Sequence, residues 1–330
     1  MILATFARTG GQPTVGLVDR KAESIVDLQA LNRARNGADA PALASMLDLI
    51  KSGERGLDLV RSLGQKAASD AAFTLKLADV RLLAPVPVPE SIREFSVFEK
   101  HVRDAPVASS KLKAKVWGTP APSGPPPTRA PQVFYDAPAF YQMNRFSMSG
   151  PEDDVHWPTY SKSHFDYELE IGMFIGRDGV DIPRDRAKDH IFGFTIFNDF
   201  SAREQQWREM ETRMGPSKGK SFDTGNTSGP WIVTRDEMPE IKNLEVAVIV
   251  NGETWTRTTT EGMLHSFEDM IAYVSRFETL HAGEMFASGT VGGCSGMEID
   301  RWIKVGDVVE LEVSGIGRLR NRVATGPAAT

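Results

Sequence analysis

Acidic side chains stand out in a short segment that has the alternating pattern of a strand. In DYELEI, a period-two strand points Glu168 and Glu170 to one face, with about 7 Å between their Cα atoms. Asp199 ends a second apolar run, residues 192–199. Because carboxylates buried without a partner are costly, we expect a compensating cation, Mg²⁺ first and then Mn²⁺ or Ca²⁺. The alternative is that the two glutamates form a solvent-facing row on an edge strand.

A histidine and two carboxylates lie close together in residues 92–104, IREFSVFEKHVRD, whose apolar residues recur at helical spacing. At spacings of seven and three, Glu94, His101 and Asp104 would share one helix face. This arrangement predicts that His101 acts as a general base oriented by Asp104. The alternative is a surface histidine in a helix of ion pairs.

Three other motifs do not indicate a function. The segment ending in Gly-Lys220-Ser is not a phosphate-binding loop, because Met214 stands where the first glycine is needed. The lone Cys294 excludes an intrachain disulfide and is expected to be a small packing residue. The arginines of GRLRNRV alternate along a strand and are explained by a solvated face.

The elements around these residues predict two units. Residues 1–85 contain β-prone runs at 2–6, 14–18 and 24–28 and helical spacing over 43–63. The proline-rich segment 83–89 is expected to be a linker. Strand signals then appear at 167–175, 192–198, 244–250 and 307–313, with one helix at 266–277. Because strands outnumber helices and do not alternate with them, we expect an α+β fold.

Residues 105–131 are rich in lysine and then in proline. The pattern predicts a loop without secondary structure. A loop of that length inside a compact domain is usually functional or disordered. An active-site lid and a disordered insertion are therefore both open.

Length and composition set the broad class. At 330 residues and a typical ~150 residues per domain, we expect about two domains with a sizeable core. A net charge of −6 argues against a nucleic-acid partner, because such proteins carry a basic surface. We find no signal-peptide core and no stretch near the ~20 apolar residues of a membrane span, so a cytoplasmic protein without a membrane partner is expected.

Six segments occur in the order and spacing seen in one known family. They are EFSVFEKHV, DYELEIGMFIG, GFTIFNDFSAREQQW, KGKSFDTGNTSGPW, SGTVGG and KVGDVVELEVSGIGRLRNRV. On these motifs the chain resembles the fumarylacetoacetate hydrolase family over about residues 85–323. The resemblance implies a mixed β-sandwich roll at 86–330, preceded by a small N-terminal α+β accessory domain at 1–85. It also implies a Mg²⁺ site, with Mn²⁺ or Ca²⁺ as alternatives, and a homodimer.

The resemblance implies roles for the acidic residues. By position, Glu168, Glu170 and Asp199 match the three metal ligands that the family shares. Glu94 stands where the fumarylacetoacetases proper have an aspartate ligand. The resemblance therefore implies up to four carboxylates at the metal.

Catalytic and substrate-binding roles follow from the same motifs. His101 matches the catalytic base, and Asp104 falls where the acylpyruvase branch has a glutamate that pairs with this histidine. Lys220 would stabilise an oxyanion together with Gln206. The residues that match or resemble substrate contacts are Tyr141, Arg203, Gln206 and Thr290.

For function, the resemblance implies a metal-dependent hydrolase that cleaves a carbon–carbon bond of an acylpyruvate or β-diketo acid, in the catabolism of aromatic compounds or sugars. The cation would stabilise the enolate, His101 would activate water, and Arg203 would bind a substrate carboxylate. Family membership leaves two alternatives open. One is a decarboxylase, dehydratase or isomerase acting on a 2-oxo acid, and the other is a binding protein without turnover.

Overall fold

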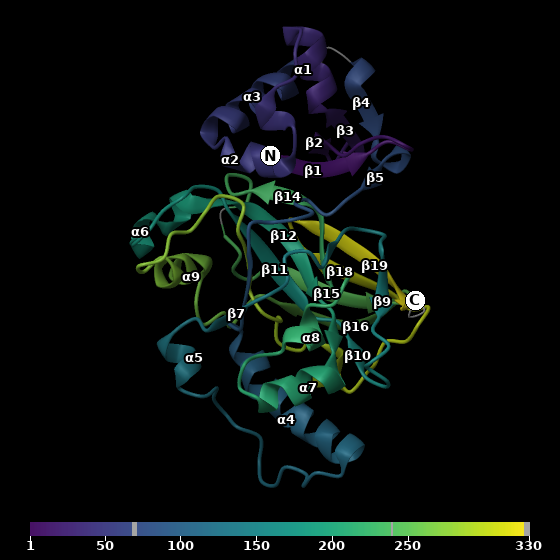
Figure 1. The fold of residues 1–330 in the computed structure, drawn as a ribbon, viewed down its shortest axis with the longest axis vertical. Coiled ribbons are helices and arrows are strands. Elements are labelled where there is room, and N and C mark those ends of the chain that lie inside the picture. The colour runs from purple at the N-terminus through teal and green to yellow at the C-terminus, as the bar shows by residue number, and fades with distance from the viewer. Residues whose placement is uncertain (68–70, 239, 327–330) are drawn as a thin grey trace.

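The N-terminal unit is a small antiparallel sheet covered by helices (Figure 1). A computed structural model describes residues 1–67, 71–238 and 240–326 of the chain. The strands of this unit are β1 (Ile2–Ala7), β2 (Thr14–Asp19), β3 (Ser24–Asp27), β4 (Thr74–Lys76) and β5 (Arg81–Leu82). The helices are α1 (Leu28–Asn36), α2 (Met46–Lys51) and α3 (Glu54–Ala67), with 3₁₀ turns at Pro41–Leu43, Ala71–Phe73 and Leu77–Asp79. Helix α1, which the sequence pattern did not predict, begins where Asp27 accepts a hydrogen bond from the Ala30 N–H.

The strands of the N-terminal unit continue into the main sheet. In the described residues this sheet has twelve strands, with the order β4-β3-β2-β1-β14-β12-β11-β17-β6-β7, while β5 pairs with β1 and β8 with β14. The strands beyond the first unit are β6 (Ile92–Phe95), β7 (Phe140–Gln142), β8 (Met148–Ser149), β11 (Leu169–Ile175), β12 (Ile191–Asp199), β14 (Asn226–Thr234) and β17 (Met285–Ala287). At the junction, Leu3 pairs with Ile232. The domain boundary near residue 85 stays a prediction, since backbone pairing joins the two units.

A second sheet faces β11 and β12 across the main core. Its strands follow the order β16-β15-β18-β19-β9, and β10 pairs with β13 in a separate ladder. The bounds are β9 (Asp154–Trp157), β10 (Phe165–Asp166), β13 (Ser201–Ala202), β15 (Glu245–Val250), β16 (Glu253–Thr259), β18 (Val308–Val313) and β19 (Gly317–Thr325). Ile196 of β12 in the main sheet and Val248 of β15 and Leu311 of β18 in the second sheet share one core without exposure to solvent. The predicted α+β fold is confirmed.

Four helices gather at the end of the molecule opposite the N-terminal unit (Figure 1). These are α4 (Glu99–Trp117), α5 (Val133–Asp136), α7 (Arg203–Glu211) and α8 (Ser217–Lys220). The other helices are α6 (Arg184–Ala187), α9 (Phe267–Val274), α10 (Gly296–Ile299) and a 3₁₀ turn at Lys188–His190. Over the described ranges, none of the helices combines the length and apolar character that crossing a bilayer requires.

The prediction of one helix over residues 92–104 is wrong. Residues 92–95 form β6, which pairs in parallel with β17 and antiparallel with β7, and α4 begins only at Glu99. Pairing on both sides satisfies the backbone N–H and C=O groups of this buried segment, and this outweighs the local apolar spacing. Glu94 and His101 therefore lie on different elements rather than on one helix face.

The prediction of a structureless loop over residues 105–131 is wrong for its first half. Helix α4 runs through Pro106 to Trp117, over a stretch rich in the helix-favouring residues Ala and Lys. It ends at Gly118, whose φ of 67° lies in the left-handed region that glycine adopts at low cost. The proline-rich remainder follows an irregular path before α5. Whether it closes over a ligand stays a prediction.

Candidate active site

Three buried carboxylates from three strands of the main sheet meet at one place. Glu94 comes from β6, Glu170 from β11 and Asp199 from the last position of β12. Each offers one oxygen, and these oxygens lie within 4.8 Å of one another. The exposed fractions of the three residues are 4%, 0% and 0%. The sheet thus places three acidic ligand groups in one water-excluded spot.

The donor set of these carboxylates fits a divalent cation. Glu94 Oε2, Glu170 Oε1 and Asp199 Oδ1 are buried, and no residue in the described part of the chain gives them a hydrogen bond. Burial and the charges of its two neighbours raise the pKa of Glu94 well above its ordinary value. Burial and nearby carboxylates do the same for Glu170, and burial raises the pKa of Asp199 to about 6. Oxygen ligands at this spacing suit Mg²⁺ or Mn²⁺, which would offset the repulsion.

Glu168 is buried beside this group but contacts cations. Its Oε1 lies 2.7 Å from Arg203 Nη2, and its Oε2 accepts a hydrogen bond from Lys220. Burial raises the pKa of Glu168, but the charges of Arg203 and Lys220 outweigh it, so the pKa lies below its ordinary value. The alternative prediction that Glu168 and Glu170 form a solvent-facing row is therefore wrong, because they are only 4% and 0% exposed. Direct metal ligation by Glu168 stays a prediction.

Lys220 forms a bridge between two of the acidic side chains. Its Nζ donates to Glu168 and, at 2.6 Å, to Asp199 Oδ2. Burial lowers the pKa of Lys220, but the charges of Asp199 and Glu168 outweigh it and raise the pKa above its ordinary value. Lys220 is therefore a protonated donor beside the carboxylate cluster, and its role in stabilising an oxyanion stays a prediction.

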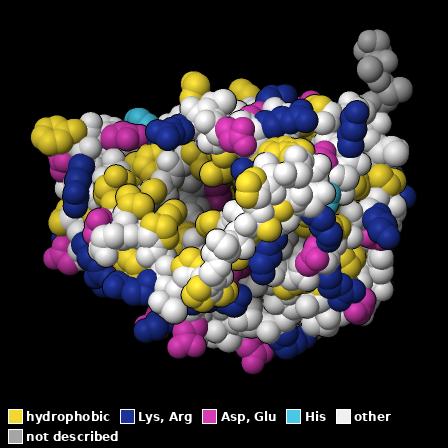
Figure 2. All heavy atoms as spheres, turned by 90° about the horizontal axis from the view of Figure 1, so that it is seen from below, with side chains coloured by type: hydrophobic (Ala, Val, Ile, Leu, Met, Phe, Trp, Pro, Cys, Tyr) yellow, Lys and Arg dark blue, Asp and Glu magenta, His cyan; other side chains and the backbone are white. Residues whose placement is uncertain are grey.

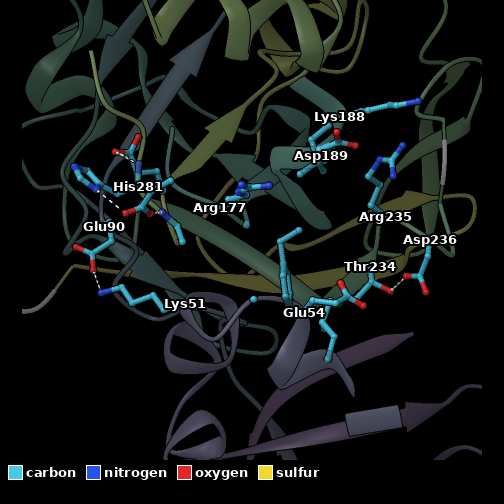
Figure 3. A pocket seen from close by; sticks show the side chains of 18 of the residues that line it. Lys51, Glu54, Glu90, Arg177, Lys188, Asp189, Thr234, Arg235, Asp236 and His281 are labelled. Atoms are coloured by element: carbon cyan, nitrogen blue, oxygen red, sulfur yellow. Dashed lines mark hydrogen bonds and ion pairs between the residues drawn. The ribbon is translucent and has the colours of Figure 1, made fainter. Parts of the chain in front are cut away.

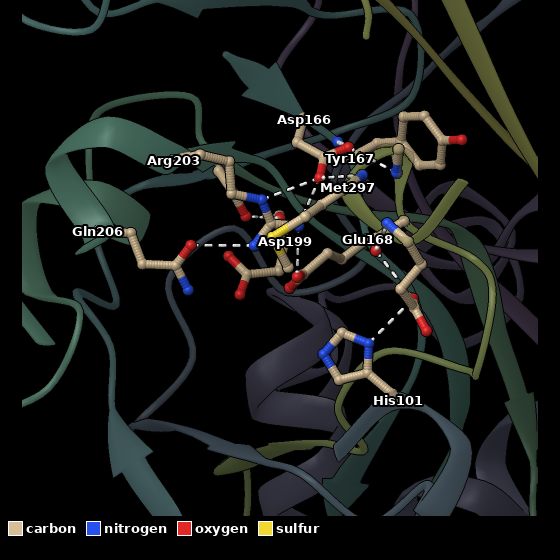
Figure 4. A network of polar contacts seen from close by, with 12 residues as sticks. His101, Asp166, Tyr167, Glu168, Asp199, Arg203, Gln206 and Met297 are labelled. Atoms are coloured by element: carbon tan, nitrogen blue, oxygen red, sulfur yellow. Dashed lines mark hydrogen bonds and ion pairs between the residues drawn. The ribbon is translucent and has the colours of Figure 1, made fainter. Parts of the chain in front are cut away.

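His101 forms a dyad with a carboxylate that the sequence did not predict. In the first turn of α4, its Nδ1 lies 3.0 Å from Oε2 of Glu298 on α10 (Figure 4). Glu298 is also held by the Gly293 N–H at 2.9 Å and by the Ser295 hydroxyl at 2.8 Å. Burial lowers the pKa of His101, but the charge of Glu298 outweighs it and raises the pKa. Nε2 is left free to exchange a proton with a ligand, since no described residue bonds to it.

The predicted pairing of Asp104 with His101 is wrong. The Asp104 carboxylate lies 2.7 Å from Arg103 Nε and 3.0 Å from Lys100 Nζ. Two adjacent cations satisfy it locally, while the imidazole turns toward α10. The only signal for Glu298 in the sequence is the Ser295-x-x-Glu298 pattern of a helix start, where Ser295 caps α10. That pattern predicts a helix and no chemistry.

Arg203 is held in a buried network centred on Asp166, a second residue that sequence reasoning missed (Figure 4). Its Nε and Nη2 donate to Asp166 Oδ2 at 2.9 and 2.5 Å, and its Nη1 donates to Gln206 at 2.9 Å. Asp166 also accepts hydrogen bonds from the N–H groups of Gly296 and Met297, which begin α10. Asp166 therefore ties the helix that carries Glu298 to the arginine that holds Glu168.

Glu94 and Asp199 of the carboxylate cluster and His101 of the dyad line one cavity of about 570 Å³. Every predicted site residue lines this cavity except Asp104 and Glu170; those that do are Glu94, His101, Tyr141, Glu168, Asp199, Arg203, Gln206, Lys220 and Thr290. The Tyr141 hydroxyl donates to Asp199 Oδ2 at 3.3 Å. Seen from below Figure 1, this face is hollowed, with acidic side chains deep inside (Figure 2). The substrate roles of Tyr141, Arg203, Gln206 and Thr290 stay predictions.

A larger cleft, of about 1000 Å³, lies between α2 and α3 of the N-terminal unit and the main sheet (Figure 3). Its acidic side chains have partners: Glu90 bonds to Lys51, Asp178 lies 3.5 Å from His281, and Asp236 accepts from Thr234. It contains no group of orphaned buried carboxylates within the described residues. We therefore assign the chemistry to the smaller cavity.

A sandwich-like α+β fold with a carboxylate cluster, a buried lysine and a histidine–carboxylate dyad defines a class of enzymes suited to metal-assisted acid–base chemistry. Residues 110–324 match the family model described as fumarylacetoacetate (FAA) hydrolase C-terminal, and the chain belongs to this family. The mitochondrial oxaloacetate tautomerase fahd2 of Xenopus laevis is 29% identical over 94% of the chain and 86% of its own length.

Two further relatives are similar over nearly the whole chain. The oxaloacetate tautomerase YisK of Bacillus subtilis (strain 168) is 28% identical over 91% of the chain and 93% of its own length. Maleylpyruvate hydrolase from Sphingobium sp. SYK-6, solved with manganese(II) and pyruvate, has a TM-score of 0.70 at 24% identity, covering 99% of the chain and 100% of that structure. At that identity the structural likeness supports the fold alone.

Proposed function

We propose that the chain is a divalent-metal-dependent enzyme that interconverts the keto and enol forms of a 2-oxo acid, of which oxaloacetate is the first candidate. The observation that carries this proposal is the His101–Glu298 dyad, whose histidine lines the same cavity as Glu94 and Asp199, two of the three orphaned carboxylates, while the third, Glu170, is fully buried beside them. The chain belongs to a family of enzymes. Two oxaloacetate tautomerases are similar to it over 94% and 91% of its length, which supports this reaction.

The carboxylates of Glu94, Glu170 and Asp199 would hold the ion. When bound, a divalent cation supplies Lewis acidity for the carboxylate and carbonyl oxygens of a 2-oxo acid. Lys220 adds a buried positive charge at the same place, on the side of Glu168. The maleylpyruvate hydrolase that shares this fold was solved with manganese(II) and pyruvate, so Mn²⁺ and a small 2-oxo acid are the first ligands to test here.

His101 would move the proton. Its neutral Nε2 takes a proton from C3, the C–H electron pair forms the C2–C3 double bond, and the carbonyl π pair moves onto the C2 oxygen. Nε2 then returns the proton to that oxygen, which completes the enol. Glu298 fixes the tautomer of the ring through Nδ1 and stabilises the imidazolium between the two transfers.

Hydrolysis of a carbon–carbon bond in an acylpyruvate is the second candidate. The same dyad supports it, because Nε2 could deprotonate a water that adds to the acyl carbonyl. The C–C bond would then break to give a carboxylic acid and a pyruvate enolate, which takes up a proton at C3. Both candidates thus use one proton transfer at C3. A small-molecule oxo-acid substrate fits both, and the homodimer stays a prediction.

The decisive assay follows the ultraviolet absorbance of enol-oxaloacetate in the presence of Mg²⁺ or Mn²⁺. We expect the wild-type protein to accelerate ketonisation and His101→Ala to lose about 10²–10⁴-fold of that acceleration, the usual contribution of a general acid–base. Release of acetate from acetylpyruvate without any effect on oxaloacetate would replace the first candidate by the second. Absence of both activities in metal-loaded protein would refute the proposal.

A further inference from the structure

The cavity extends well beyond the carboxylates, and its outer wall is apolar. Helices α4, α5 and α7 and strand β7 contribute this wall, from the side chains of Val102, Ala105, Phe134, Phe140, Trp207 and Met210. Hydrophobic side chains gather beside the hollow in Figure 2. A volume of about 570 Å³ lies within the 300–1,000 Å³ typical of sites for drug-sized ligands. A four-carbon diacid would leave this outer part unfilled.

The cations that line the cavity already have partners. Arg203 and Lys220 lie at its inner end and are bound to the buried carboxylates. At the outer end, the described residues contribute Lys113, whose Nζ lies 3.9 Å from Glu211 and 5.8 Å from the centre of the Trp117 ring. A second carboxylate at the far end of a long substrate would therefore have to compete with Glu211 for Lys113, and its desolvation would be only partly compensated.

We propose that this outer wall binds an uncharged apolar arm at C3 or beyond, so that a 2-oxo acid with an alkyl or aryl arm binds more tightly than pyruvate and than a chain of equal length that ends in a second carboxylate. The inference rests on the proposed function for the position of the oxo-acid head at the metal cluster. Each methylene that leaves water for the wall improves affinity by about fourfold. Met210 is suited to such an arm, because its thioether is flexible, adapts to different shapes and is half exposed at the rim.

Binding of inert analogues to the Mn²⁺-loaded protein tests the arm without turnover. Calorimetry would compare pyruvate, 2-oxohexanoate and 2-oxooctanoate, with 2-oxoadipate as the analogue of 2-oxohexanoate that ends in a carboxylate. We expect affinity to rise at least about tenfold from pyruvate to 2-oxooctanoate. We expect 2-oxoadipate to bind more weakly than 2-oxohexanoate. Equal affinities along the series, or tighter binding of 2-oxoadipate, would overturn the inference.

A matched pair of variants tests whether the apolar arm of the substrate binds against α7. Met210→Glu should abolish most of the gain in affinity from pyruvate to 2-oxooctanoate. Met214→Glu, an exposed methionine that does not line the cavity, should leave the whole series unchanged. An unchanged gain in Met210→Glu would overturn this placement. Accelerated ketonisation of oxaloacetate without rising affinity along the series would refute the arm alone. Rising affinity without either proposed activity would refute the proposed function alone.

Discussion

The imidazole Nδ1 of His101 and the carboxylate Oε2 of Glu298 lie 3.0 Å apart, although 197 positions separate the two residues. The Glu298 side chain is 1% exposed and the His101 side chain 14% exposed, so the carboxylate is enclosed while the ring reaches the cavity. Burial opposes charge on both groups, yet each partner favours the charged form of the other. The dyad can therefore hold a proton on the ring during a reaction.

Removal of the Glu298 charge should reduce catalysis. Glu298→Gln keeps the shape of the side chain but cannot stabilise the imidazolium, and we expect kcat to fall by about 10²-fold or more. Asp104→Asn is the matched control, since Asp104 bonds to Lys100 and Arg103 instead. Its kcat should stay within about threefold of wild type, as for a surface ion pair. An equal loss in both variants would contradict the dyad.

The pH profile of kcat should report His101. The base is active when neutral, so activity rises as pH increases through its pKa, which Glu298 raises above the ordinary 6.5 against the effect of burial. In Glu298→Gln this pKa falls, and the acidic limb should move to lower pH while the plateau drops. Profiles at saturating Mn²⁺ would show the shift, and Asp104→Asn should keep the wild-type midpoint. If the acidic limb of the profile does not move in Glu298→Gln, a group other than His101 causes that limb.

Strand periodicity predicted the position of the acidic residues well, because alternation along a buried strand is a local property. The predicted strands at 167–175, 192–198, 244–250 and 307–313 correspond to β11, β12, β15 and β18. The wide separation of Glu168 and Glu170 from Asp199 in sequence did not matter, since the β11–β12 ladder brings them together, with Leu169 opposite Asn198. Glu94 was assigned by the family resemblance and not by periodicity.

The partners of the charged residues could not be predicted from local patterns. Asp104 stands three positions from His101 and met the spacing rule, but two neighbouring cations take it. Glu298 and Asp166 reach the candidate site only because α10 packs against β10 and α4. No local pattern in the sequence indicates these long-range contacts. Strand β6 was predicted as part of a helix for the same reason, because its partners β17 and β7 are distant in the chain.

Replacement of Glu170 in the carboxylate cluster should change the stability of the protein in opposite directions with and without metal. Burial and neighbouring carboxylates raise the pKa of Glu170, so its charged form is unfavourable in the folded state and this destabilisation grows as pH rises above the unfolded pKa. At neutral pH, Glu170→Gln should therefore raise the melting temperature of the metal-free protein.

With Mn²⁺ present, the sign should reverse. Wild-type protein gains about 2.7 kcal/mol at a metal concentration 100 times its Kd, and Glu170→Gln should lose most of this gain. Melting curves with EDTA and with Mn²⁺ would measure both effects. Glu310→Gln is the control, because the Glu310 carboxylate bonds to Arg318 on the second sheet. This variant should respond to Mn²⁺ as wild type does. Undiminished metal stabilisation of Glu170→Gln would contradict the site.

Asp166 should support both stability and catalysis. Asp166→Asn leaves the buried Arg203 with one charged partner, Glu168, in place of two, and we expect a cost of up to about 3–5 kcal/mol, the value for breaking a buried ion pair. Denaturant unfolding would measure this loss, and Asp104→Asn, at a more exposed pair, should lose less than about 1 kcal/mol.

A second variant separates the positioning role of Asp166 from its structural role. Asp166→Asn/Arg203→Met replaces the ion pair with neutral groups and should recover much of the stability. It should not recover kcat, because the contacts to Glu168 and Gln206 are lost with the guanidinium. Full recovery of kcat together with stability would show that the network is structural only.

Hydrogen–deuterium exchange at C3 of a 2-oxo acid tests the central claim most directly. In D₂O with Mn²⁺, NMR would follow loss of the C3 protons of 2-oxohexanoate with wild-type protein, His101→Asn and Asp104→Asn. We predict rapid exchange with wild type and Asp104→Asn, and a rate with His101→Asn that is at least about 10²-fold lower. Exchange by wild type no faster than in metal solution alone, or exchange unchanged in His101→Asn, would contradict the assignment of His101 as the group that moves the proton.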